Sequence, residues 1–187
     1  MTNSDDRPSG GARRPDGKPG RIDGVFWGRM TRHVDDRGAL REVYRASWSD
    51  KRFVQANVSS SRAGVLRGLH LHRRQLDCWI VLNGRVFVAL VDPRPILRGE
   101  AGRPAVETWE IHADQWVVIP AGVAHGFYAI EETDLLYLVT NEFDGTDELG
   151  FAWDDPYAGV PWPTDHPILS ARDRANPPLQ DLLRSIT

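Results

Sequence analysis

Three histidines and one aspartate have the spacing in this sequence that most clearly suggests chemistry. His70 and His72 stand at positions i and i+2 in the segment G-V-L-R-G-L-H-L-H. Alternate side chains of a β-strand point to the same face, so we expect both imidazoles to face one way. Asp77 follows five residues later, and P-A-G-V-A-H adds His125 just after a tight turn. Imidazole and carboxylate groups together are suitable ligands for Fe(II), Mn(II), Ni(II) or Zn(II).

This spacing resembles the two metal-binding motifs of the cupin superfamily. The chain reads G-x5-H-x-H-x4-D-x6-G followed by P-x-G-x2-H, with Asp77 standing where those proteins usually have glutamate. The resemblance implies a divalent metal held by His70, His72, Asp77 and His125. For an H-x-H pair taken alone, surface or core histidines remain the alternative explanation.

Short runs of β-branched and aromatic residues, separated by turn residues, must position these side chains. The dipeptide Asn83-Gly84 tolerates the positive φ angles of a two-residue type I′ turn, which predicts a hairpin between the runs on either side. Leucines and an isoleucine at i, i+3, i+4 and i+7 predict one helix over residues 178–186 that covers the β structure. Many antiparallel strands at short spacing indicate a sandwich or barrel. Strands are predicted at residues 53–59, 65–72, 77–82, 85–92, 108–112, 115–119, 126–130 and 135–141.

Charge and hydropathy exclude two classes of partner. The net charge of −3, from 23 basic and 26 acidic residues, gives no basic field that would hold nucleic acid. The sequence has no apolar run near the roughly 20 residues needed to cross a bilayer, and no hydrophobic signal segment at its start. We therefore expect a cytoplasmic protein without a nucleic-acid or membrane partner.

The chain length of 187 residues predicts one domain preceded by a tail. Residues 1–24 contain five glycines, three prolines and no aromatic residue, so we expect them to be disordered. Residues 25–187 form the predicted single domain. Cys78 is the only cysteine, which excludes an intrachain disulfide and favours a buried thiol.

A longer resemblance covers roughly residues 25–185. On seven segments the chain resembles the dTDP-4-dehydrorhamnose 3,5-epimerase family, a branch of the cupins. This resemblance implies an all-β cupin fold, which is a double-stranded β-helix or jelly-roll barrel, with a short C-terminal helix. The segments are D-D-R-G-A-L-R-E (35–42), F-V-Q-A-N-V-S (53–59), G-V-L-R-G-L-H (64–70), V-I-P-A-G-V-A-H-G-F (118–127), L-L-Y-L-V-T-N (135–141), F-A-W-D-D-P (151–156) and L-S-A-R-D (169–173).

The resemblance implies epimerisation of a dTDP-linked 4-keto-6-deoxy hexose at C3, C5 or both. Protons beside the C4 ketone are acidic, so their removal gives an enolate, and reprotonation on the other face inverts the carbon. In the family the histidine of R-G-L-H is the base, a late aspartate supports it and a tyrosine is the opposing acid. These roles fall on His70, Asp173 and Tyr137. A histidine suits a base near pH 7, and a carboxylate on its far nitrogen fixes the tautomer.

The same resemblance implies a small-molecule nucleotide sugar as partner and a homodimer whose N-terminal strands are exchanged. The resemblance also implies that epimerisation requires no cofactor. Arginines are suited to forked hydrogen bonds with a diphosphate. Nucleotide contacts are implied for Arg37, Glu42, Gln55, Asn57 and Arg67.

The chain departs from the family at two positions. The family normally has lysine, which stabilises the enolate, at the position of Asp77, and often glutamine at the position of His72. A carboxylate beside an enolate destabilises it unless a cation such as a divalent metal lies between them. A metal on His70 would conflict with its role as base, because a ring bound to both a metal and Asp173 has no lone pair left.

Two other functions therefore stay open from the sequence. One is a metal-dependent cupin enzyme, an isomerase or oxygenase, that uses His70, His72, Asp77 and His125. The other is a sugar-nucleotide binding protein without catalytic activity, since the lysine is missing.

Overall fold

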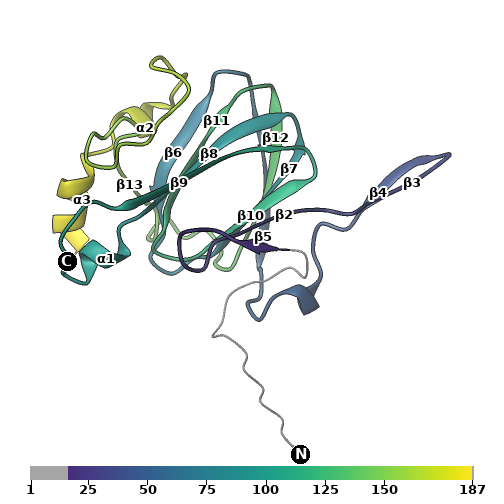
Figure 1. Ribbon diagram of the computed structural model, residues 1–187, viewed down its shortest axis with the longest axis horizontal. Helices are drawn as coiled ribbons and strands as arrows, with labels where there is room; N and C mark the ends of the chain where they lie inside the picture. The colour runs from purple at the N-terminus through teal and green to yellow at the C-terminus, as the bar shows by residue number, and fades with distance from the viewer. Residues whose placement is uncertain (1–16, 187) are drawn as a thin grey trace, which may run out of the picture.

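The computed structural model describes residues 17–186, in which strands predominate (Figure 1). The predicted strands and the C-terminal helix are all present, with boundaries shifted by up to three residues, and the predicted all-β class is confirmed. The strands are β1 (Lys18–Pro19), β2 (Phe26–Arg29), β3 (Arg32–Asp35), β4 (Gly38–Arg41), β5 (Gln55–Ser61), β6 (Leu66–Leu71), β7 (Asp77–Asn83), β8 (Arg85–Asp92), β9 (Ala105–His112), β10 (Gln115–Ile119), β11 (Ala124–Ala129), β12 (Thr133–Val139) and β13 (Leu149–Gly150). The helical segments are η1 (Ala46–Trp48), α1 (Arg94–Leu97), α2 (Ala171–Arg174) and α3 (Leu179–Ile186).

Two antiparallel sheets form the two walls of the barrel. One has the strand order β1-β2-β10-β7-β12-β5, and the other has the order β13-β6-β11-β8-β9. Strands β5, β6, β7, β11 and β12, which carry most of the predicted site residues, therefore come from both walls. No helix in the described part of the chain is long and apolar enough to cross a membrane.

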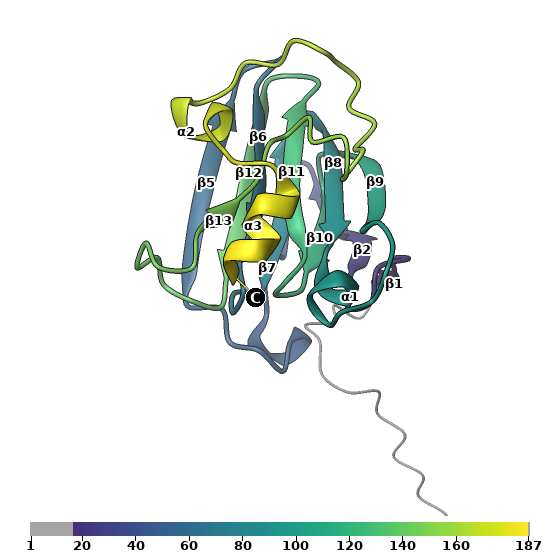
Figure 2. The same cartoon turned by 90° about the vertical axis from the view of Figure 1, so that its left-hand side faces the viewer.

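Alternation along β8 shows how the core is divided. Val86, Val88 and Leu90 point between the two sheets, where they join the main buried cluster. Ala89 and Val91 point to the opposite face and pack in the cluster that includes leucines of α3. Figure 2 shows α3 lying across the outer face of the five-stranded sheet. The helix thus buries this second face, as its apolar periodicity predicted.

The predicted hairpin at Asn83-Gly84 is wrong. Strands β7 and β8 exist, but β7 pairs with β10 and β12, whereas β8 pairs with β9 and β11. Gly84 has the expected positive φ of 83°, but Asn83 is not among the described residues with positive φ, so the turn is not type I′. The dipeptide instead carries the chain from one sheet to the other.

A buried carboxylate anchors the segment before β2. Oε2 of Glu107 accepts hydrogen bonds from the backbone N–H groups of Arg21 and Ile22, at 2.8 and 3.0 Å. Oε1 accepts from the indole N–H groups of Trp27 and Trp109, both at 3.1 Å, and the two indoles stack at 4.6 Å. The side chain of Ile22 is buried. The predicted disorder of residues 1–24 is therefore wrong for residues 18–24, while residues 1–16 lie outside the described part.

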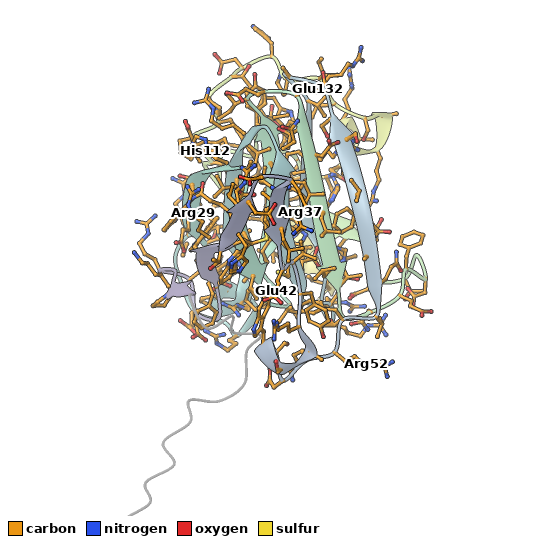
Figure 3. The ribbon with its side chains drawn as sticks, turned by 90° about the vertical axis from the view of Figure 1, so that its right-hand side faces the viewer. Arg29, Arg37, Glu42, Arg52, His112 and Glu132 are labelled. Carbon is orange, nitrogen blue, oxygen red and sulfur yellow. The ribbon has the colours of Figure 1, made fainter. Side chains whose placement is uncertain are left out.

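Strands β3 and β4 form a separate two-stranded arm that projects from the barrel (Figure 1). Val34 and Leu40 on this arm are 71% and 67% exposed. Figure 3 looks at the side from which the arm projects and labels Arg37 at its turn and Glu42 just after it. Cys78 is buried on the other face of the six-stranded sheet, which confirms the prediction of a buried thiol.

Candidate active site

A cavity of about 500 Å³ collects most of the residues singled out in the sequence. Strands of both sheets line it, together with the loop at residues 141–148. His70 and His72 both line this cavity, as their i, i+2 spacing predicted. The candidate residues lining it are Gln55, Asn57, Arg67, His70, His72, Asp77, His125 and Tyr137.

His70 and Asp173 form a pair at one wall of the cavity. Nε2 of His70 lies 2.8 Å from Oδ1 of Asp173, whose side chain is almost fully buried at the start of α2. Because a carboxylate accepts, Nε2 carries the proton and Nδ1 keeps the lone pair. Burial acts to raise the pKa of Asp173, but hydrogen bonds from His70 and Ser170 and nearby positive charges outweigh it and lower that pKa. Asp173 thus stays ionised at neutral pH and fixes the tautomer that leaves Nδ1 basic.

Tyr137 lines the cavity from the other sheet. It lies on β12 in the six-stranded sheet, whereas His70 lies on β6 in the five-stranded one. Burial, followed by the negative charge of Asp77, raises the pKa of Tyr137 above its usual value. The phenol is therefore protonated at neutral pH and has a proton to donate. His70 and Tyr137 thus line one cavity from two different sheets.

Three of the five predicted nucleotide contacts lie in this cavity. Gln55 and Asn57 come from β5, and the amide of Gln55 donates to Oδ1 of Asn57 at 3.0 Å. Nε of Arg67 donates to Ser61 at 3.0 Å, which leaves other guanidinium N–H groups for a ligand.

Arg37 and Glu42 are not among the residues lining this cavity. The Arg37 side chain is 88% exposed and pairs with Asp35 at 2.6 Å, while Glu42 pairs with Arg45. Both therefore lie on or beside the projecting arm, outside the lining of this cavity.

His72, Asp77 and His125 form a second, buried group on the cavity wall. Each offers one ligand atom, and these atoms lie within 4.8 Å of one another. His70, the fourth predicted ligand, is not in this group, and its Nε2 is hydrogen-bonded to Asp173. Burial raises the pKa of Asp77 and lowers that of His125 well below its usual range, since a charge is costly in this water-poor space.

Two glycines set the distance between β6 and β11 beneath these groups. The register places His125 opposite His70 and shifts before Phe127. A Cβ added to Gly68, which has φ of 132°, would lie 2.6 Å from Cα of Gly126. Only a residue without a side chain allows this backbone contact, so the glycine pair holds the two histidine-bearing strands together.

The sequence reasoning did not identify several side chains that support the site. Gln75 and Trp79 donate to the two oxygens of Asp77, at 2.8 and 3.2 Å. Gln75 and Trp79 stand two residues before and after Asp77. The same i, i+2 alternation that predicted a shared face for His70 and His72 would therefore have identified them. The backbone oxygen of Asp147 lies 2.6 Å from Nδ1 of His72, a contact across 75 residues that no local pattern indicates.

Comparison with known proteins places the chain in a family. A sequence model described as dTDP-4-dehydrorhamnose 3,5-epimerase matches residues 19–181. The chain belongs to this epimerase family. The dTDP-4-dehydrorhamnose 3,5-epimerase of Pseudomonas aeruginosa is 37% identical over 157 residues, which cover 75% of this chain and 82% of that protein.

Solved structures of such epimerases share the fold. The rmlC epimerase of Mycobacterium tuberculosis superposes with a TM-score of 0.80 at 29% identity, covering 91% of each chain. The dTDP-6-deoxy-D-glucose-3,5-epimerase of Legionella pneumophila, solved with dTDP-4-keto-L-rhamnose, gives 0.78 at 29% identity, covering 88% of this chain and 93% of the other. The predicted cupin barrel with a short C-terminal helix, and the isomerase class, are thereby confirmed.

Proposed function

We propose that this protein epimerises a dTDP-linked 4-keto-6-deoxy hexose at C3, C5 or both. The observation that carries the proposal is the His70–Asp173 pair facing Tyr137 across one cavity between two sheets. Relatives named as epimerases of such sugars support the substrate class. The comparisons do not favour the two alternatives, a metal-dependent cupin isomerase or oxygenase and a binding protein without turnover.

The proposed reaction moves one proton off a carbon and another onto it. Nδ1 of His70 takes the proton beside the C4 ketone, and the electron pair of the C–H bond passes to the carbonyl oxygen as an enolate. Asp173 stabilises the imidazolium that forms. The phenol of Tyr137 then protonates the carbon from the opposite face. Solvent returns a proton to the phenolate and takes one from the imidazolium of His70, which restores both groups. Side chains and solvent carry every proton, so this reaction needs no cofactor.

We further propose that a homodimer completes the nucleotide end of the site. The arm formed by β3 and β4 projects from its own barrel with exposed Val34 and Leu40, which is an unfavourable arrangement for an isolated chain. A partner copy would bury these residues and receive Arg37 and Glu42 beside its own Gln55, Asn57 and Arg67. A cytoplasmic location stays a prediction.

Hydrogen exchange tests the reaction directly. A 4-keto-6-deoxy dTDP-sugar in deuterated water should exchange at C3 or C5, as NMR measures, because exchange reports proton removal even where no net product accumulates. His70→Ala should abolish exchange, and Tyr137→Phe should retain exchange but lose inversion. Tyr128→Phe, at a tyrosine outside the cavity, is the matched control. Absence of exchange with several 4-keto sugar nucleotides would remove the epimerase proposal.

Dimerisation has a separate test. Leu40→Asp should place a charge in the proposed contact and shift the mass measured by light scattering from dimer to monomer. Arg52→Asp, at an exposed position outside the arm, is the control. An unchanged dimer in Leu40→Asp, or a monomeric wild type, contradicts the exchanged-arm proposal.

A further inference from the structure

His72, Asp77 and His125 form a buried group of three potential metal ligands. Their exposed fractions are 7%, 3% and 4%, so water has little access to them. His72 follows β6, Asp77 begins β7 and His125 lies on β11. Three strands from two sheets therefore bring three potential ligand atoms within 4.8 Å of one another.

The protons of the two imidazoles point away from the group. Nδ1 of His72 lies 2.6 Å from the backbone oxygen of Asp147, and Nδ1 of His125 lies 3.1 Å from that of Val123. A carbonyl oxygen only accepts, so each Nδ1 carries its proton, and in the neutral imidazole Nε2 then carries a lone pair. Such a bond on the far nitrogen is also the arrangement that orients metal-ligating histidines.

Asp77 brings two carboxyl oxygens to the same space. Its two oxygens accept hydrogen bonds from Gln75 and Trp79, which are neutral donors. Oδ2 lies 3.8 Å from Nε2 of His125, too far for a hydrogen bond that would join them. Within residues 17–186, no lysine or arginine is seen to form an ion pair with Asp77. The Nε2 atoms of the two imidazoles and the carboxyl of Asp77 thus meet in one buried space.

We propose that His72, Asp77 and His125 bind one divalent transition-metal ion, separately from the His70–Asp173 pair. Two imidazoles and one carboxylate leave coordination positions open and suit Fe(II), Mn(II), Ni(II), Co(II) or Zn(II). Bonds of roughly 2.1 Å place ligand atoms roughly 3.0–3.5 Å apart, so the 3.8 Å between Asp77 and His125 needs only a small movement.

This assignment removes the conflict between base and ligand. His70 keeps the lone pair on Nδ1, because the site does not use its ring. A divalent ion acts as a Lewis acid toward carbonyl and enolate oxygens, which is the positive charge that a lysine at position 77 would otherwise provide. The site itself does not depend on the proposed epimerisation.

Metal binding is measured on the full chain without a polyhistidine tag, after treatment with a chelator. Titration with Co(II) should give one saturable site per chain, seen in its visible absorption, and a rise in melting temperature. His72→Gln, Asp77→Asn and His125→Gln should each weaken binding by more than the roughly 10–100-fold that loss of a partner behind a ligand costs. His70→Ala and the exposed-site control His112→Gln should bind as the wild type does.

Two results would overturn the assignment. One is the absence of stoichiometric binding of Co(II), Zn(II) or anaerobic Fe(II) by the folded wild type at micromolar concentration. The other is binding that survives the three ligand variants or is lost in His70→Ala. If a ligand variant does not fold, the stoichiometry and melting shift of the wild type decide the question. None of these readouts uses turnover, so they stand apart from the exchange test.

Discussion

The carboxylate of Glu107 offers the sharpest test of how the fold is held. Its four hydrogen bonds divide evenly, with two backbone N–H groups on Oε2 and two indole N–H groups on Oε1. In Glu107→Gln one oxygen becomes an NH₂ group. Whichever way the amide turns, that NH₂ faces two donors and leaves both without an acceptor.

The size of the effect follows from those two unsatisfied groups. A buried donor that loses its acceptor costs about 1–3 kcal/mol. Two such donors lower the free energy of unfolding by about 4 kcal/mol, taking the middle of the range. Each kcal/mol corresponds to roughly 2–4 °C in a domain of this size, so the melting temperature should fall by about 8–16 °C.

Calorimetry of wild type and variant measures this loss. Glu110→Gln is the matched control, since Glu110 lies on the same strand but is exposed and pairs with Arg85 at 3.5 Å, an interaction worth at most about 1 kcal/mol. Amide exchange at Arg21 and Ile22 should accelerate only in Glu107→Gln. A Glu107→Gln melting temperature within about 2 °C of the wild type would show that this carboxylate does not anchor the segment.

Two further predictions concern the site. Because the pKa of Asp173 is lowered in the fold, its ionised form adds stability that is present above the unfolded pKa, near about 4, and is lost as pH falls through the lowered value. The melting difference between wild type and Asp173→Asn should therefore narrow on acidification below about pH 4, and a widening difference would contradict the pairing. Gly68→Ala should lose about 2–4 kcal/mol by denaturant unfolding, from its clash and its positive φ, whereas Gly38→Ala, with the same φ but open space, should lose only about 1 kcal/mol. Equal losses would refute the close backbone contact.

Local pattern predicted the strands better than their partners. The apolar alternation of β7 and β8 located both strands, and Asn83-Gly84 located the turn between them. The pairing was wrong because β7 bonds to β10 and β12, which lie tens of residues away and bury both of its edges. Turn chemistry reports a change of direction, whereas sheet membership depends on side chains elsewhere in the chain.

Long-range contacts also explain what composition missed in the site and the N-terminal segment. The i, i+2 spacing of His70 and His72 correctly predicted that both line the cavity. Asp173, 103 residues beyond His70, determines which nitrogen of the His70 ring keeps its lone pair. Residues 18–24 look unstructured by composition, and Glu107 orders them from 85 residues away. The family resemblance supplied such distant pairs where periodicity did not.

The contact between Gly68 and Gly126 divides the site into a part that tolerates few substitutions and a part that tolerates many. Beneath the histidines the two backbones touch, so a larger residue at either glycine would displace the strand that carries His70 or His125. At the mouth of the same cavity, residues 142–145 are exposed and lie outside regular structure. Substrate preference can therefore diversify at the rim while the proton-transfer geometry stays constant, and a library aimed at new sugars belongs in that loop.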